Sequence, residues 1–440
     1  RGHLRFWWRT TQGQAYMDRA GAESKDKPYD LLRRREAALW GMASVVGTKG
    51  DDPLASAVRV AATSVGAMTT RTISDDRAPI GSGLGYLYFP AREQRGGNRR
   101  DAGSYWWGPE LRLEVSLDLE LFKRNLDRAD PDCAELQSDE QLRTEAEREI
   151  AASFWAWTHF GGIGARTRRG SGALKCTSAE GPFKEMLAPK HATAGEVLQS
   201  FEKASQLFVR GTGAHAGDFP VLKGATVVTA PLAVGPRQVA YRGKSTTIDE
   251  PERVAYGVGK ILQEFRQGVP FARNPGKNGP RPGRSKWPEP DAIRALLQEW
   301  SPMHRPEAPI FFPRAALGLP IVVKYNTSEP SSQGDPAGQI TIKPAGKLER
   351  LASPVILRPI ALNSPGQYAL IGLSLNAPVE PPGGLVVKSQ KVEVPLPTSA
   401  LPVEGAPIHS KKVAPLGGFQ FAATALLKMI AGQTGGRRTL

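Results

Sequence analysis

Cysteine is scarce in this chain of 440 residues, which contains only Cys133 and Cys176. Two cysteines cannot build a disulfide framework or a cysteine-rich zinc site, so a reduced, cytoplasmic protein is the simplest interpretation. The six histidines, at positions 3, 159, 191, 215, 304 and 409, form no HExxH or other metal-binding spacing. No apolar run is long enough to span a bilayer, and no signal peptide is visible after Arg1. We therefore expect no metal, no other cofactor and no membrane association.

Acidic residues are outnumbered, with 43 Asp and Glu against 58 Lys and Arg, which leaves a net charge of +15. An excess of this size favours partners such as nucleic acid or an anionic surface, although many basic proteins bind neither. Hydrophobic residues make up 40% of the chain, which argues against wholesale disorder. The length exceeds what one core usually organises, so at least two domains are expected.

The stretch Phe160–Gly172, here called the glycine–arginine loop, is the most distinctive feature. Its glycines and polar residues are Gly161, Gly162, Gly164, Arg166, Thr167, Arg168, Arg169, Gly170 and Gly172. Glycines at this density permit positive φ angles and close approach of a ligand, and both N–H groups and guanidinium groups suit phosphate. The loop follows a predicted helix and precedes a predicted strand, the reverse of a dinucleotide-binding turn, and it is not a Walker A motif. We expect it to hold a polyanion.

The first nine residues, RGHLRFWWR, predict an amphipathic helix. Leu4, Trp7 and Trp8 share one face, and Arg1, Arg5 and Arg9 line another, with His3 in the same segment. One interpretation is a buried apolar face opposite a solvated basic face. The other is that the aromatic face docks on a sheet while the basic residues contact RNA phosphates.

The order of predicted elements in the first 185 residues is typical of a ferredoxin-like unit. A second helix runs from Asp30 to Trp40, strands are expected at 57–60, 68–73, 86–89 and 110–118, and Ser138 to Gln141 resembles a capping box that opens a helix to about His159. A strand at 173–177 then follows the glycine–arginine loop. This is a β-α-β-β-α-β order that lacks only its first strand, which would precede Arg1. The basic stretch 90–104, with Trp106 and Trp107 beyond it, suits RNA stacking or a solvated loop beside a buried tryptophan pair.

The rest of the chain predicts a helical connector over 186–218, with its helix capped by Thr193, and a second α+β domain over 219–440. Strands are expected at 219–229, 321–325, 339–342, 354–362 and 367–375, and helices at 251–267, 291–300 and 419–430. The predicted fold class is α+β, with two tandem ferredoxin-like domains.

Four segments together resemble the RAMP superfamily of CRISPR proteins. They are RGHLRFWWR at the start, FWAWTHFGGIGARTRRG around the loop, FPRAALGLP at 312–320 and LASPVILRP at 351–359. More narrowly, they are similar to the first-numbered RAMP subunit of the type III-B, or Cmr, effector complex. Ser171 stands where that pattern has an aromatic residue. The resemblance implies a non-catalytic subunit that binds guide RNA near its 3′ part, and target RNA, beside the other subunits of the complex.

Two alternatives stay open from the residues alone. A metal-independent RNA endonuclease would need a histidine such as His159 or His3 to activate a 2′-hydroxyl group. A structural role for His159 at its helix end is the simpler interpretation, because the sequence shows no partner acid. In the other alternative, the arginines of the loop bind acidic neighbouring proteins instead of RNA.

Overall fold

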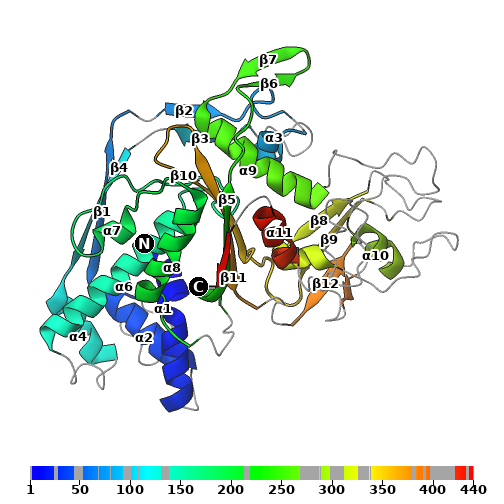
Figure 1. Cartoon of the computed structure of the whole chain (residues 1–440). Coiled ribbons are helices and arrows are strands. Elements are labelled where there is room, and N and C mark those ends of the chain that lie inside the picture. Colours follow the sequence, from blue (N-terminus) through cyan, green and yellow to red (C-terminus); the bar gives the residue numbers. More distant parts are fainter. Residues whose placement is uncertain are drawn as a thin grey trace.

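We describe a computed structural model of the chain, shown in Figure 1. The description covers residues 2–23, 28–43, 53–67, 69–79, 81–92, 101–107, 110–129, 138–212, 219–267, 287, 289–297, 312–325, 336, 338–378, 383–389, 393–396, 422–432 and 436–439. Arg1, Cys133, His215, His304 and His409 lie outside these residues, as do parts of the two basic stretches at 90–104 and 268–290.

The protein has a mixed α+β fold. Its helices are α1 (Gly2–Glu23), α2 (Pro28–Trp40), α3 (Gly83–Tyr88), α4 (Leu119–Ala129), α6 (Asp139–Phe160), α7 (Lys184–Leu187), α8 (Ala194–Phe208), α9 (Glu250–Gln267), α10 (Glu289–Leu296) and α11 (Ala422–Ala431), with 3-10 turns η1 (Phe89–Ala91) and η3 (Pro313–Leu317). Its strands are β1 (Val58–Val65), β2 (Thr69–Thr72), β3 (Ser104–Trp107), β4 (Glu110–Leu117), β5 (Val221–Pro231), β6 (Gln238–Tyr241), β7 (Lys244–Thr247), β8 (Ile321–Lys324), β9 (Gln339–Pro344), β10 (Val355–Ala361), β11 (Tyr368–Asn376), β12 (Leu385–Lys388), β13 (Glu393–Pro395) and β14 (Gly436–Thr439).

A four-stranded antiparallel sheet in the order β10-β11-β5-β14 lies at the centre. Successive side chains of a strand point to opposite faces, so each strand contributes to two cores. Val227, Ile356 and Ile371 belong to the core that includes α1, α6 and α8. Val228 and Leu357 belong to the core that includes α9 and α11. Helices therefore cover both faces of this sheet (Figure 1).

The N-terminal helices pack around a buried carboxylate on α6. Glu149 accepts hydrogen bonds from Trp8 Nε1 at 2.9 Å, from Tyr16 Oη at 3.1 Å and from Arg35 Nη2 at 2.8 Å. The four side chains are all buried. As predicted, Leu4, Trp7 and Trp8 form the apolar face of α1. The network joins α1, α2 and α6 into one unit that carries the glycine–arginine loop.

Smaller sheets surround this centre. A second four-stranded sheet, β13-β12-β9-β8, has its own core with Ile293 of α10 and Phe312 before η3. The pairs β1-β4, β2-β3 and β6-β7 are two-stranded. The β1-β4 ribbon runs along one side of the molecule (Figure 1). The strand predicted at 110–118 is confirmed, but its apolar face is less covered than expected, since Leu111 and Val115 are exposed.

The cap signals at Ser138, Thr193 and Gly41 are confirmed, whereas α2 begins at Pro28, two residues before the predicted start at Asp30. The Ser138 side chain accepts from Gln141 N while the Gln141 side chain accepts from Ser138 N, a complete capping box at the start of α6. Thr193 caps α8 by accepting from Glu196 N at 3.2 Å. Gly41 ends α2 with a φ of 77°. Local interactions of this kind do not depend on distant parts of the chain, which explains why they could be predicted.

The prediction of a strand at 86–89 is wrong, because this segment ends helix α3 and enters η1. Ser82 caps the helix, and glycines allow it to lie close against α9. A Cβ on Gly83 would come 2.8 Å from Lys260 N, so only glycine permits this approach. Aromatic residues favour strands in isolation, but the packing against α9 determines the structure here.

The strand predicted at 173–177 is also wrong, since these residues adopt no regular structure. An isolated parallel bridge between Arg169 and Leu357 of β10 lies a few residues earlier. The division into 1–185, 186–218 and 219–440, and the arrangement as two tandem ferredoxin-like domains, stay predictions. The core strands β5, β10 and β11 share one hydrophobic cluster with α1 and α6.

Candidate functional site

The glycine–arginine loop begins where α6 ends. Gly161 N donates to the carbonyl oxygens of Ala156 and Trp157, which closes the helix, and Trp157 Nε1 donates to Gly162 O at 3.1 Å. Ile163 N then donates to Gly172 O at 3.0 Å, so the two ends of the loop are held together. The loop is fixed to the helix before it leaves the core.

The same loop is attached to the edge of the central sheet. Leu357 N on β10 donates to Arg168 O at 2.9 Å, and Arg169 and Leu357 form the parallel bridge. Gly170 has a φ of 86°, and a Cβ at this position would lie 2.8 Å from Val258 Cγ1 of α9. The loop is therefore clamped between β10 and α9.

Most glycines of the loop lie against neighbouring atoms that leave no room for a side chain, and they do not form an open surface. A Cβ on Gly161 would lie 2.5 Å from Trp7 Nε1, and one on Gly162 would lie 2.5 Å from Gly172 O. Gly164 differs, because a Cβ there meets nothing within 4 Å. The exposed tip comprises Ile163, Gly164 and Ala165. A ligand can reach the backbone at this tip, while the other glycines let the loop fit between its neighbours.

Two of the three arginines donate to backbone carbonyl groups. Arg166 Nη1 donates to Leu87 O, at the C-terminal end of α3. Arg168 Nη1 donates to Ser353 O, and its guanidinium group lies 5.1 Å from the centre of the Phe6 ring. Burial lowers the pKa of Arg168 from its ordinary value. These two side chains support the loop as well as adding positive charge, and Thr167 is half-buried between them.

Arg166, Arg169 and Arg266 form what we call the guanidinium cluster. Arg266 lies in the last turn of α9, outside the segment singled out by sequence. Burial, and then the charge of Arg169, lower the pKa of Arg166 to about 10. Burial, and then the charge of Arg266, lower the pKa of Arg169. Within the described part of the chain, no carboxylate pairs with any of the three.

A further arginine lies beneath the segment that follows the loop. Arg358 of β10 is fully buried, and its Nη2 donates to Leu174 O at 2.6 Å. Its Nε and Nη1 have no hydrogen-bond partner. Burial lowers its pKa to about 9. The loop thus rests on a sheet edge that is itself positively charged.

The basic face predicted for the N-terminal helix is occupied within the protein. Arg5 Nε lies 2.6 Å from Glu36 Oε1 of α2, and Arg9 Nη2 lies 2.7 Å from the same oxygen. The hydrogen bond to Glu36 raises the pKa of Arg9. His3 is exposed, and Arg1 lies outside the described residues. Arg5 and Arg9 are thus paired with an acid of the neighbouring helix, and their contact with RNA phosphates stays a prediction.

His159 is a buried histidine at the end of α6, as the simpler interpretation expects. Its Nδ1 lies 2.8 Å from Trp155 O, and its ring packs against Phe201 at 5.5 Å between centres. Burial lowers its pKa to about 3, so the imidazole is neutral at pH 7. In this position it contacts core residues and not the exposed tip of the loop.

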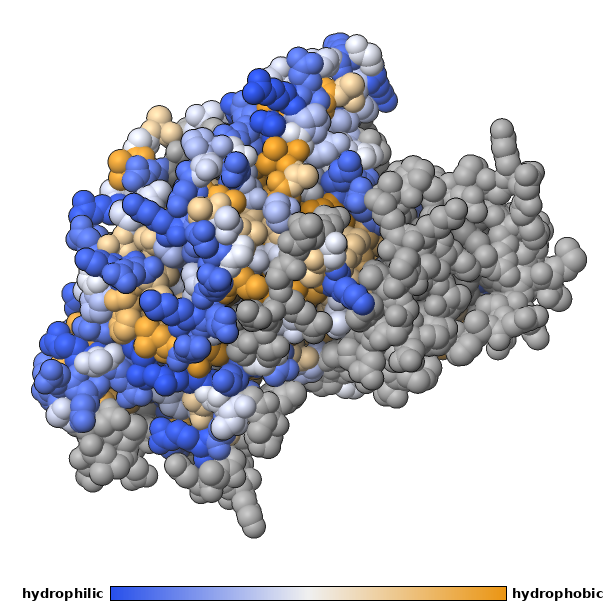
Figure 2. Space-filling view, in the orientation of Figure 1, coloured by the Kyte–Doolittle hydropathy of each residue, from blue (hydrophilic) through white to orange (hydrophobic). Residues whose placement is uncertain are grey.

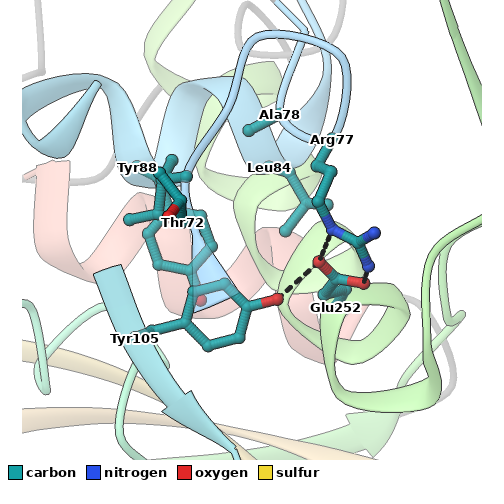
Figure 3. Close-up of a pocket in the computed structure, with 8 residues that line it drawn as sticks. Thr72, Arg77, Ala78, Leu84, Tyr88, Tyr105 and Glu252 are labelled. Carbon is teal, nitrogen blue, oxygen red and sulfur yellow. Dashed lines mark hydrogen bonds and ion pairs between the residues drawn. The ribbon is translucent and has the colours of Figure 1, made fainter. Parts of the chain in front are cut away.

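A small crevice lies near α3 and is shown in Figure 3. Glu252 of α9 accepts from Arg77 Nε at 2.8 Å and from Tyr105 Oη, and Tyr105 stacks on Tyr88 with ring planes 2° apart. Burial raises the pKa of Tyr88 to about 12. The crevice holds about 10 Å³, which is room for about one water. Its polar groups bind one another, so they join the turn before α3 and strand β3 to α9.

The described residues offer few other features of a chemical site. They contain no group of three or more His, Cys, Asp or Glu side chains that could hold a metal ion. No helix among them is long and apolar enough to cross a membrane. Figure 2 shows hydrophilic residues over much of the described face, with hydrophobic patches interspersed. The guanidinium cluster is therefore the strongest candidate for a ligand site.

Sequence reasoning found the loop but missed two groups beside it. In the sequence, Arg266 is an ordinary basic residue in the last turn of a helix, where its positive charge interacts favourably with the helix dipole. Tyr86, whose carbonyl oxygen lies 3.5 Å from Arg166 Nη1, belongs to a segment for which the sequence predicts a strand. No local pattern marks either residue, because their positions depend on the contact between α3, α9 and the loop.

Comparison with known proteins matches residues 1–175 to the model of the RAMP superfamily. The matched segment starts in α1 and ends just beyond the glycine–arginine loop, so it includes Arg166 and Arg169 but not Arg266. No curated protein and no solved structure matches the chain.

Proposed function

We propose that this chain is a non-catalytic RNA-binding subunit of a type III-B (Cmr) CRISPR–Cas effector complex. It would contact the 3′ region of the guide RNA, the target RNA, or both, beside other subunits of the complex, in antiviral defence in the cytoplasm. The observation that carries this proposal is the guanidinium cluster at the glycine–arginine loop. The RAMP match over residues 1–175 and the net charge of +15 support it.

The guanidinium cluster lacks a balancing acid among the described residues. Half-buried guanidinium groups that repel one another and lack a carboxylate reduce the stability of the folded protein. A phosphate group would supply the missing negative charge and accept two parallel N–H bonds from one guanidinium group. Because the loop is attached to α6, β10 and α9, little ordering would accompany binding, and this favours affinity.

The non-catalytic assignment rests on the surroundings of the loop. A general base must reach the proton that it removes and must titrate near the working pH. His159 is buried in the core with a pKa of about 3, which supports a structural role. His3 is exposed on α1, but it belongs to no described cluster of acid and base groups.

The experiment removes Arg169 and Arg266 together. Arg166 and Arg168 are left in place, since both donate to backbone carbonyl groups that hold the fold. We expect the double variant Arg169→Ala/Arg266→Ala to bind single-stranded RNA more weakly for every sequence tested. Its plot of log affinity against log salt should be flatter by roughly 0.7 for each lost contact. Binding is measured by fluorescence anisotropy between about 50 and 300 mM salt, because the affinity changes strongly over this range.

A matched control removes the same charge elsewhere. Arg34 of α2 and Lys388 of β12 are exposed and lie outside the loop, so Arg34→Ala/Lys388→Ala should keep the wild-type slope. Equal slopes for the two double variants would contradict the proposal.

Incubation of the protein with repeat RNA in EDTA tests the enzyme alternative, which predicts site-specific cleavage that His159→Ala abolishes. Unchanged RNA binding with loss of co-purifying subunits would favour the protein-binding alternative.

A further inference from the structure

Phe89 is the most exposed of the large hydrophobic side chains reported for the described residues, with 64% of its surface accessible. It opens the 3-10 turn η1 directly after α3. Its neighbour Tyr88 points inward and stacks on Tyr105. Of these two adjacent aromatic residues, Tyr88 therefore faces the core and Phe89 faces the solvent. Single exposed hydrophobic residues are common, and exposure alone says little. The position of Phe89 is what distinguishes it.

Phe89 is linked to the guanidinium cluster through Arg166. Arg166 Nη1 donates to the carbonyl oxygen of Leu87, two residues before Phe89, and lies 3.5 Å from that of Tyr86. The arginine therefore ties the end of α3 to the glycine–arginine loop. Arg166 repels Arg169 and Arg266 across the same small region. An exposed aromatic ring thus lies two residues beyond the carbonyl group that Arg166 of the guanidinium cluster binds.

The turn that carries Phe89 is rigid on both sides. Arg166 holds the preceding residues, and the buried Arg92 pairs with Asp75 just after the turn. Pro90 fixes one backbone angle within the turn, and Gly103 N donates to Ala91 O at 2.6 Å. The backbone that carries the ring is therefore fixed, and little backbone freedom is lost when a flat partner stacks on it.

We propose that Phe89 is a stacking platform for a base of single-stranded RNA whose phosphates bind the guanidinium cluster. Proteins that bind single strands combine a positive groove for the backbone with aromatic rings for the bases. An acidic protein segment would neutralise the charge of the arginines. A nucleotide would do so through its phosphate, and its planar base would also stack on the exposed ring of Phe89.

This inference rests on the proposed function, and the test separates the two. The probes are a fluorescein-labelled oligouridylate and an oligomer of the same length with abasic riboses, which keeps the phosphates and lacks the bases. We expect Phe89→Ala to weaken binding of oligouridylate by about 5- to 150-fold, the range for one stacked base. Binding of the abasic oligomer and the salt slope should not change, because the arginines remain. Phe89→Trp should restore oligouridylate binding.

Val322→Ala serves as the control, since Val322 of β8 is 52% exposed and lies in the second four-stranded sheet. It should leave binding of both probes unchanged. Equal affinity of Phe89→Ala and wild type for oligouridylate would overturn the stacking role and leave RNA binding intact. Equal weakening of both probes would also overturn it, since that result signals damage to the phosphate site. If the wild type binds neither probe, the proposed function fails as well.

Discussion

Replacement of Glu149 by alanine tests how the N-terminal helices hold the glycine–arginine loop. The carboxylate accepts from Trp8, Tyr16 and Arg35, and both it and Arg35 are 2% exposed at the side chain. The change leaves a buried guanidinium group without its closest partner and two further donors unpaired. Loss of one partner of a buried ion pair costs about 3–5 kcal/mol. We expect a loss of this size in the free energy of unfolding.

The chain offers a matched control on the same arginine. Glu145 Oε2 lies 3.7 Å from Arg35 Nη2, but its side chain is 31% exposed. A partly exposed pair contributes about 0–1 kcal/mol, so Glu145→Ala should have little effect. Glu149→Gln keeps the shape and one acceptor, and it should fall between the two alanine variants.

The assay is urea unfolding followed by tryptophan fluorescence, with RNA binding measured on the same samples. Trp8 lies in the network and Trp7 contacts the loop at Gly161, so loosening of α1 should reach the loop. We therefore expect Glu149→Ala to lower RNA affinity as well as stability. Equal stability of Glu149→Ala and Glu145→Ala would refute the reasoning, because burial would then not decide the contribution of each carboxylate.

Two further outcomes follow from the loop and its supporting helix. The pKa of His159 is about 3 in the folded protein and 6.5 as its ordinary value, so the unfolded chain binds more protons between these pH values. The contribution of the neutral imidazole to the free energy of unfolding is therefore fully present above pH 6.5. It should fall by about 3 kcal/mol by pH 4.5. His159→Gln should lack this part of the loss in urea unfolding, and an identical loss would contradict it. Gly170→Ala should destabilise the protein more than Gly164→Ala, since both have positive φ but only Gly170 would press a Cβ against Val258. Thermal unfolding compares the two, and equal midpoints would show that backbone strain alone, about 1–2 kcal/mol, accounts for both.

The elements that could be predicted from sequence are those with a local cause. Helix α6 starts after Ser138 because its cap bonds span three residues, and α8 starts after Thr193 for the same reason. Strands β10 and β11 also lie within one residue of the strands predicted at 354–362 and 367–375. In each case the deciding interactions lie within a few positions of one another, where a single sequence displays them.

The features that could not be predicted depend on distant contacts. Helix α3 exists because Gly83 allows it to approach α9, although its aromatic residues favour a strand. Arg5 pairs with Glu36 across 31 positions, so the basic face of α1 is not free. At the candidate site, the sequence identified the loop itself. It did not identify Arg266, which reaches the loop only through the packing of α9.

The parallel bridge between Arg169 and Leu357 has a consequence for solubility. β10 is an edge strand of the central sheet, and edge strands can pair with strands of other molecules. The glycine–arginine loop covers part of that edge by accepting the Leu357 N–H group. A loop variant that frees β10 would therefore expose a template for self-association. The segment proposed to hold RNA also keeps the sheet from adding strands of a neighbouring molecule.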